Sequence, residues 1–295
     1  MTVSRNKSSA MGMAAIALVV AIIALVSAFW RSSSQTSVSN DVGSHGLPGL
    51  LQRIESTGEL HAGYGVYPPY TQENPNTKEV SGFSVDIINQ IAKDLKCKIV
   101  WHRLNWNTMS ADLKRGEYDV IADPIFQTIP RAREFAFTEP YAYFPDGIGV
   151  VRRDDNRFRA FDDLDQKGVT IAVGQGWASE TLIQSRFTKA TVVPVQTATD
   201  LLQVFNEVIS GRADVAVADA ADAKRFVQEH PNEVKALFLD NPPAFMPAGF
   251  ALRPEDRRSA EFLTVCLRNL KATGVLDGIA RRYDLPSYNV FGERK

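Results

Sequence analysis

The sequence predicts an α/β fold in which two lobes with mixed sheets face a common cleft. From residue 47 onward, segments with helical hydrophobic spacing alternate with short apolar runs, which is typical of a fold with largely parallel sheets. One helix–glycine–strand unit occurs twice, at residues 115–123 and 210–219. Because ligands bind beyond the carboxyl ends of strands in open α/β sheets, two such units indicate a ligand cleft between two lobes.

The N-terminus carries a hydrophobic segment that we expect to enter a membrane. Arg5 and Lys7 precede an uncharged run at residues 11–30, which is apolar on every face and therefore unlike a buried core helix. Near its end, Val26-Ser27-Ala28 resembles a cleavage site, yet the run is long enough to span a bilayer. Residues 1–30 are thus a signal peptide or a membrane anchor, and the serine-rich residues 31–46 are a linker. The folded part is expected in the periplasm or on the outer face of the cytoplasmic membrane.

Two amphipathic helices are expected at residues 86–96 and 261–274, because their apolar side chains recur at helical spacing. The first apolar face consists of Ile87, Ile88, Ile91 and Leu95, and the second of Phe262, Leu263, Cys266, Leu267 and Leu270. Strand-like apolar runs are found at residues 98–101, 119–122, 147–151, 169–173 and 213–218. Strands that alternate with helices of this length indicate the α/β class.

The repeated unit places a carboxylate at the end of each of two strands. In both copies a glycine ends a helix, an aspartate follows three residues later, and an apolar strand ends in a second carboxylate, Asp123 or Asp219. Helix, glycine and strand recur in any α/β protein, so a duplicated architecture and a coincidence both remain open. Their position at strand ends makes the two carboxylates candidate cleft residues.

Composition and spacing argue against several other functions. The formal net charge of −1 gives no electrostatic footprint for nucleic acid or for an anionic membrane surface. The four histidines are scattered without ligand spacing, and no hydrolase or nucleotide-binding motif occurs, so we expect neither a metal site nor a cofactor. Cys97 and Cys266 permit a disulfide in an exported protein but equally two buried thiols.

Five motifs, in a fixed order, resemble a known family. They are LLQRIESTGELHAGYGVYPPYTQE, GFSVDIINQIAKDL, TIPRAREFAFTEPY, GRADVAVADAADA and LKATGVLDGIARRYDLPSYNVFG, and they extend over residues 50–292. Together they resemble the extracytoplasmic solute-binding proteins of family 3, which serve amino-acid ABC transporters. The resemblance implies a two-lobed clamshell of the periplasmic-binding-protein type.

In that clamshell the chain builds most of the first lobe, crosses to the second and returns. The crossings are expected near residues 145–149 and 238–243. Lobe 1 would then comprise residues 47–147 and 241–295, and lobe 2 would comprise residues 148–240.

The resemblance also implies how the ends of a ligand are held. The arginine of the family's threonine-x-x-arginine motif, which holds a ligand carboxylate, corresponds to Arg131, with Thr128 as the threonine. A guanidinium suits this role because it is always charged and matches a carboxylate with two parallel hydrogen bonds. The aspartate that pairs with a ligand ammonium corresponds to Asp219, for which a simple turn role is the alternative.

Three aromatic residues correspond to the walls of the family's pocket. Tyr67 takes the place of the aromatic residue in a YPPF-like motif, Tyr70 takes the place of its phenylalanine, and Trp106 lies near the aromatic residue that walls the side-chain pocket. Ordinary core packing is the alternative for each of them.

The chain departs from the family pattern around the expected carboxylate site. Asp123, Pro124 and Phe126 stand where the family usually has small hydroxyl residues, and Trp177 and Ala178 replace the threonines of a GTT-like turn. A carboxylate beside the guanidinium would neutralise it inside the pocket, and the proline removes one N–H donor. We therefore expect these positions to contact the ligand and to shift specificity away from an ordinary α-amino acid.

Two function classes follow from the resemblance. The favoured one is a monomeric solute-binding protein that captures a small amino-acid-like or other polar solute by hinge closure and delivers it to the permease of an ABC transporter. The rival is an enzyme similar to the periplasmic prephenate and arogenate dehydratases, with Glu180 as the acid that protonates a leaving hydroxyl. A glutamate there also occurs among the binding proteins, and the glycine-glycine-threonine-asparagine turn that the dehydratases favour is absent. The sequence therefore favours a binding protein over an enzyme.

Overall fold

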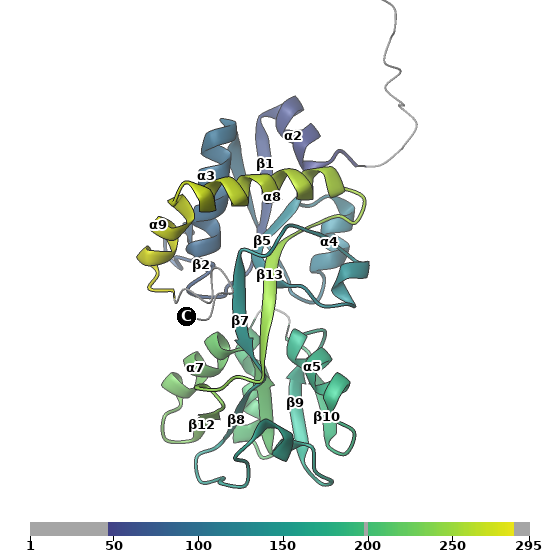
Figure 1. Ribbon diagram of the computed structural model, residues 1–295, viewed down its shortest axis with the longest axis vertical. Coiled ribbons are helices and arrows are strands. Elements are labelled where there is room, and N and C mark those ends of the chain that lie inside the picture. Colours follow the sequence, from purple (N-terminus) through teal and green to yellow (C-terminus); the bar gives the residue numbers. More distant parts are fainter. Residues whose placement is uncertain (1–46, 198–199, 286–295) are drawn as a thin grey trace, which may run out of the picture. The chain divides into compact units, whose positions relative to one another are not determined.

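Two large sheets organise the part of the chain that the structure describes (Figure 1). The computed structural model describes residues 47–197 and 200–285. The expected signal peptide or anchor at residues 1–30 and the linker at residues 31–46 lie outside the described residues. Among the helices that are described, none is long and apolar enough to cross a membrane.

The first sheet has the strand order β4-β1-β5-β13-β6, and β7 also pairs with β13. Its strands are β1 (Glu59–Tyr64), β4 (Lys98–Arg103), β5 (Val120–Phe126), β6 (Ala136–Phe137), β7 (Ala142–Asp146) and β13 (Ala244–Leu252). β1 is parallel to β4 and β5, whereas β13 is antiparallel to β5, β6 and β7. The expected strands at residues 98–101 and 119–122 are confirmed, and the sheet is mixed.

β5 continues past Asp123, which the sequence placed at the end of this strand. The strand runs to Phe126, and all of its residues are buried. Its last residues pair with Ala248 and Gly249 of β13, and the register of this pairing shifts beyond Gly249. The irregular part includes Pro124, which has no N–H to donate and is therefore tolerated at a bulge. The expectation that Asp123 ends the strand is wrong, because pairing with a distant strand extends it.

The second sheet has the strand order β10-β9-β11-β8-β12. Its strands are β8 (Ile148–Arg152), β9 (Thr170–Gly174), β10 (Thr191–Val195), β11 (Val215–Ala218) and β12 (Val234–Leu237). β9 is parallel to β10 and β11, and β8 is antiparallel to β11 and β12. The expected strands at residues 147–151, 169–173 and 213–218 are confirmed as β8, β9 and β11.

The chain changes sheet at two short connections. It leaves the first sheet after β7 and enters the second with β8, with only Gly147 between them, and it returns between β12 and β13. Gly147 has a φ of 84°, and a Cβ atom there would overlap the ring of Pro243 in the other connection. The two connections therefore touch. On this change of sheet we propose residues 47–147 and 241–295 as lobe 1 and residues 148–240 as lobe 2.

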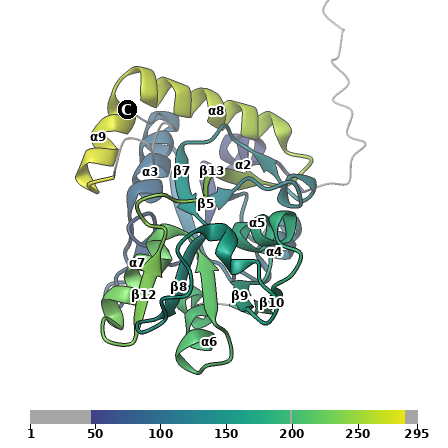
Figure 2. The same ribbon diagram turned by 60° about the horizontal axis from the view of Figure 1, so that its bottom comes forward.

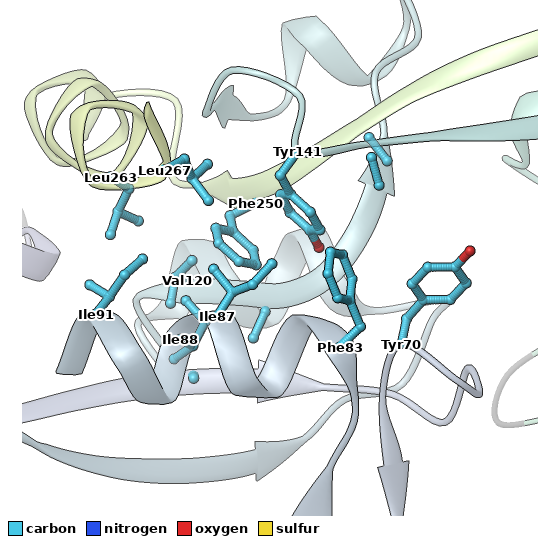
Figure 3. Close-up of a cluster of buried hydrophobic side chains, with 14 of the residues drawn as sticks. Tyr70, Phe83, Ile87, Ile88, Ile91, Val120, Tyr141, Phe250, Leu263 and Leu267 are labelled. Atoms are coloured by element: carbon cyan, nitrogen blue, oxygen red, sulfur yellow. The ribbon is translucent and has the colours of Figure 1, made fainter. Parts of the chain in front are cut away.

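Helices α3 (Phe83–Leu95) and α8 (Arg257–Ala272) enclose the core of lobe 1 (Figure 3). Ile87, Ile88 and Ile91 of α3 point toward Phe250 and the leucines of α8. Both helices match the expected ones at residues 86–96 and 261–274, although each begins three or more residues earlier. Cys97 and Cys266 pack against this core as free thiols, so the disulfide alternative is not realised.

Further helices complete the two lobes. Lobe 1 also contains α2 (Leu50–Thr57), α4 (Met109–Arg115), α9 (Val275–Arg282), the 3-10 turn η1 (Arg131–Arg133) and the short strands β2 (Gln72–Glu73) and β3 (Val80–Ser81). Lobe 2 contains α5 (Ala178–Arg186), α6 (Asn206–Ile209), α7 (Ala220–Glu229) and the 3-10 turns η2 (Phe161–Leu164) and η3 (Leu201–Phe205). Figure 2 shows α7 beside β12 and α5 beside β9 and β10. The N-termini of α5 and α7 follow the carboxyl ends of β9 and β11, where the candidate site is found.

Candidate functional site

A cavity of about 60 Å³ lies between the two lobes. Its lining from lobe 1 consists of Tyr67, Trp106, Pro124, Ile125, Phe126 and Arg131, and its lining from lobe 2 consists of Trp177, Ala178, Ser179, Leu201, Asp219 and Asp222. Trp177, Ala178 and Leu201 also pack with the hydrophobic cluster of lobe 1. The two lobes are therefore in direct contact around the cavity.

Asp219 and Tyr67 meet across this cavity. Asp219 follows β11 and caps the N-terminus of α7, where its Oδ1 accepts hydrogen bonds from the N–H groups of Ala221 at 2.8 Å and Asp222 at 3.2 Å. The Tyr67 hydroxyl donates to the same Oδ1 at 2.8 Å. Burial raises the pKa of Asp219, and these hydrogen bonds to its carboxylate oppose that rise. One carboxylate thus links the second lobe to an aromatic residue of the first.

Asp222 is a cavity residue that the sequence did not reveal. It is 2% exposed, and its Oδ1 accepts a hydrogen bond from Arg225 at 3.2 Å. Burial and the nearby Asp219 raise the pKa of Asp222 well above its ordinary value, and Arg225 opposes the rise. The available clue was its spacing, since the third residue after a helix cap lies in the first turn and faces the same side as the cap.

Arg131 joins the two lobes through backbone carbonyl groups. Its Nη1 donates to the carbonyl oxygen of Phe126 in lobe 1 at 3.3 Å, and its Nη2 donates to that of Gly176 in lobe 2 at 3.0 Å. Burial lowers the pKa of Arg131 to about 10, and the carboxylates of Asp146 and Glu134 oppose this shift. The guanidinium lies in the cavity lining, as expected, and part of its donor capacity is already used.

Asp123 lies beneath the cavity lining and not within it. It is fully buried and accepts hydrogen bonds from the Gly65 N–H and the Thr71 hydroxyl. Burial raises the pKa of Asp123 to about 6, against the effect of these two donors. Both Asp123 and Arg131 are described, and neither an ion pair nor a hydrogen bond joins them. The alternative in which Asp123 neutralises Arg131 by direct pairing is therefore wrong, because local donors already satisfy the carboxylate.

Two other expected site residues also lie outside the lining. Tyr70 belongs to the core of lobe 1 (Figure 3), and its ring lies 4.6 Å from that of Phe144 and 5.2 Å from that of Tyr67. Thr128 is buried, and its hydroxyl oxygen accepts a hydrogen bond from the backbone N–H of Arg131 at 3.4 Å. Both residues support lining residues from behind.

The two tryptophans of the lining each rest on a glycine. Trp106 packs over Gly65 in lobe 1, and Trp177 packs over Gly174 in lobe 2, so closely that a Cβ atom at either glycine would overlap the indole ring. A second cavity of about 330 Å³ adjoins the first and shares Trp106, Trp177 and Arg131 with it. We call the cavity of about 60 Å³ the inner cavity and that of about 330 Å³ the outer cavity, and both indoles belong to both linings.

Polar side chains from both lobes line the outer cavity. Asn107 of lobe 1 donates to the Oε1 of Gln196 in lobe 2 at 3.2 Å, and Gln196 donates to Gln175 at 2.6 Å. The outer cavity thus presents amide groups, whereas the inner one presents mainly aromatic and aliphatic surface with two carboxylates and the guanidinium of Arg131.

Asp146 is a second buried acid that sequence reasoning missed. It ends β7 at the first connection, and its Oδ1 accepts hydrogen bonds from the Ser179 hydroxyl at 2.5 Å and from the Gly147 N–H at 2.7 Å. Its Oδ2 is buried and has no hydrogen-bond partner. Burial raises the pKa of Asp146 to about 6, with a further contribution from Asp219. Nothing in its sequence neighbourhood separates it from an ordinary turn aspartate.

Comparison with known proteins gives this arrangement a context. Residues 60–286 match the model for the bacterial extracellular solute-binding proteins, family 3. The chain belongs to this family. Family membership agrees with the resemblance seen in the sequence.

Curated relatives of this solute-binding protein include binding proteins and an enzyme. It is 28% identical over 233 residues to a probable amino-acid ABC transporter-binding protein from Haemophilus influenzae, which covers 78% of this chain and 86% of the relative. It is 26% identical over 229 residues to cyclohexadienyl dehydratase from Pseudomonas aeruginosa, which covers 77% of this chain and 82% of the enzyme.

Solved structures give the same fold. An ancestral amino acid-binding protein, a precursor of cyclohexadienyl dehydratase, is 26% identical with a TM-score of 0.66 and covers 79% of this chain and 98% of its own. The arginine-bound form of truncated ArgBP from T. maritima is 29% identical with a TM-score of 0.61 and covers 74% of this chain and 99% of its own. The α/β clamshell expected from the sequence is thereby confirmed.

Glu180 bears on the enzyme alternative. In this solute-binding protein its carboxylate accepts hydrogen bonds from the Gly176 N–H at 2.6 Å and from the Gln184 side chain at 3.1 Å. It does not belong to the residues that line the inner cavity. Its contacts hold the turn before α5, which is a structural task that needs no substrate.

Proposed function

We propose that this family 3 solute-binding protein captures a small amino-acid-like solute between its lobes and presents it to the permease of an ABC transporter. The observation that carries the proposal is the contact between Tyr67 and Asp219, because these residues come from different lobes and line the same cavity. A ligand ammonium beside Asp219 would meet both lobes at once. Relatives that serve amino-acid transporters support the same solute class.

Closure of the lobes would be driven by such shared contacts. A ligand shifts a conformational equilibrium only by the difference between its affinities for the two states. A solute held by Asp219 of lobe 2 and by Arg131 of lobe 1 binds the closed state more tightly than the open one, because it touches both groups only when the lobes meet. The two touching connections at Gly147 and Pro243 are suited to act as the hinge.

The proposal includes the cellular location of the protein. The hydrophobic segment at residues 11–30 would export the chain or anchor it, so the lobes would work in the periplasm or at the outer membrane face, as a monomer. In intact cells, added protease should not reach the lobes, and it should reach them once the outer barrier is opened. Recovery of the lobes in the cytosol would contradict this location.

A thermal-shift screen tests the solute class. A ligand that binds only the folded protein raises the melting temperature, by an amount that grows with its concentration over Kd. We expect a rise with one or more amino acids or related zwitterions, and no rise with sugars. Scattering at saturating ligand should then show a smaller radius of gyration. A panel in which no amino-acid-like solute shifts the melting temperature would contradict the proposal.

The dehydratase alternative keeps one supporting observation, the similarity to cyclohexadienyl dehydratase. Assay of the unaltered protein with prephenate and arogenate decides it. We expect turnover no faster than the uncatalysed reaction. If turnover is measurable, Glu180→Gln should abolish it, and Gln184→Ala, which changes a neighbour of the same carboxylate, should serve as the matched control.

A further inference from the structure

We infer that the inner cavity is built for an ammonium group that carries methyl substituents. This inference rests on the proposed function, since it specifies the part of the solute that lies beside Asp219. It follows from three features of the inner cavity: its aromatic walls, its carboxylates, and the few hydrogen-bond acceptors that the walls offer.

The walls are aromatic on both lobes. Tyr67, Trp106 and Phe126 come from lobe 1 and Trp177 from lobe 2. Tyr67 and Phe126 are both fixed by Phe144, whose ring lies 5.9 Å and 4.8 Å from theirs. The faces of such rings attract cations, and aromatic cages with this composition recognise methylated ammonium groups.

The tryptophans of the cage are held rigidly. Each indole lies on a glycine that leaves no room for a side chain, Gly65 under Trp106 and Gly174 under Trp177. Fixed aromatic faces give up little conformational freedom when a ligand binds. The close packing therefore fixes each indole within its own lobe before the lobes close.

The carboxylates favour a cation in the inner cavity. Asp219 and Asp222 are 6% and 2% exposed, and both line it. Arg131 contributes one positive charge to the same lining and donates to two carbonyl oxygens. Among the described residues Asp222 forms an ion pair with Arg225 and Asp219 forms none, so a ligand cation would complement the charge of Asp219.

The aromatic walls distinguish a methylated ammonium from a primary one. A primary ammonium has three N–H donors and needs an acceptor for each when it is buried. The aromatic side chains of the lining supply ring faces and not strong acceptors, whereas Asp219 Oδ1 is already used by the Tyr67 hydroxyl and the N–H groups of Ala221 and Asp222. Methylation removes donors and keeps the charge, so a methylated ammonium suits these walls better.

The size of the inner cavity agrees with such a group. Its volume of about 60 Å³ corresponds to about four to six water-sized groups. This is sufficient for a trimethylammonium head. The remainder of the ligand would extend past the indoles into the outer cavity, where Arg131 and the amides of Asn107 and Gln196 are found.

Titration calorimetry on the full chain tests the inference with a graded series of probes. Glycine, sarcosine, dimethylglycine and glycine betaine differ only in the number of methyl groups, and choline replaces the carboxylate by a hydroxyl. We expect affinity to rise along the series, with betaine at least about tenfold tighter than glycine. Affinity that stays level or falls with methylation would overturn the inference.

The same titrations separate this inference from the proposed function. Tight binding of an unmethylated amino acid, with weaker binding of its methylated forms, supports the proposed solute class and overturns the methylammonium site. Binding of choline without any zwitterion supports the methylammonium site and contradicts an amino-acid-like solute. Absence of binding by every probe and every amino acid contradicts both.

Variants of the cage locate the effect. Trp177→Leu should lower the affinity for the methylated probe about three- to thirtyfold and reduce its ratio to glycine, whereas Trp177→Phe should keep most of that ratio. Trp101→Leu is the matched control, since Trp101 of β4 packs against Tyr64 of β1 and does not line the inner cavity. Trp106→Leu provides a second test if the Trp177 variant does not fold. An unchanged ratio in a folded Trp177→Leu or Trp106→Leu protein would overturn the cage.

Discussion

Asp123 and Asp219 occupy equivalent places in two copies of one sequence pattern, and the fold uses them differently. Asp219 follows β11, caps α7 and faces the inner cavity. Asp123 lies inside β5, receives the Gly65 N–H and the Thr71 hydroxyl, and stays beneath the lining. The same local pattern therefore produces a cavity-lining acid in one lobe and an internal structural acid in the other.

The residues that follow each aspartate explain the difference. After Asp219 a helix begins at once, so the carboxylate lies at a helix N-terminus and at the edge of the sheet. After Asp123 the chain pairs with β13, which keeps the carboxylate in the middle of a buried strand. A carboxylate at the edge of a sheet is available to solutes, whereas one inside the sheet is occupied by its neighbours.

The largest expected effect separates the two acids by ligand affinity. Asp219→Ala should weaken binding of the tightest ligand by about 2 to 5 kcal/mol, because a buried ligand cation loses its charged partner. Titration calorimetry measures the change, and Asp154→Ala, at an exposed position away from the cavity, is the control. Retained affinity in Asp219→Ala would show that the carboxylate does not face the ligand.

The second effect separates the acids by stability. Asp123→Ala leaves two buried donors without an acceptor, so the free energy of unfolding should fall by about 3 kcal/mol. Asp219→Ala removes a helix cap and should cost about 1 kcal/mol. Urea unfolding of the two variants compares them directly. An equal loss in both would break the distinction between a structural acid and a ligand-facing acid.

The pH dependence of stability sharpens the same distinction. Burial raises the pKa of Asp123 to about 6 in the folded protein, above its unfolded value, so the stabilising proton is lost as the pH rises through 6. The wild type should therefore lose stability relative to Asp123→Asn as the pH increases from about 4 to about 6.5. Urea unfolding across this range measures the difference. A constant difference would mean that Asp123 does not titrate there.

The last comparison concerns the hydrogen-bond partners of the two acids. Thr71→Val removes a hydroxyl that donates to a fully buried carboxylate and should cost about 1.5 to 3 kcal/mol. Tyr67→Phe removes a donor from an oxygen that keeps two backbone donors and should cost about 1 kcal/mol or less. Thermal unfolding of the pair gives the comparison. A larger loss in Tyr67→Phe would reverse the assigned roles.

The sequence predicted most of the fold and part of the site. Hydrophobic spacing located α3, α8 and the central strands, because these elements bury one face against a core. The roles of Arg131, Tyr67 and Asp219 came from a resemblance that covers most of the chain. The position of Asp123 within β5 depends on pairing with β13, far away in the sequence, and local patterns contain no information on that pairing.

Asp146 and Asp222 show a second limit of local reasoning. Their burial arises where separate elements meet: Asp146 contacts Ser179 at the start of α5, and Asp222 faces a cavity that both lobes enclose. Trp177 was assigned to the site as a departure from a family pattern, but the glycine beneath it became apparent only in three dimensions.

The hydrogen bonds from Tyr67, Arg131 and Asn107 to lobe 2 affect how clearly the protein can report that it is loaded. They join protein atoms only, so they stabilise the closed form of an empty molecule as well as that of a filled one. A membrane partner that recognises closure would therefore receive a background signal from empty molecules. Strengthening these bonds raises apparent affinity, since less closure free energy must come from the solute, but it lowers the contrast between full and empty carriers.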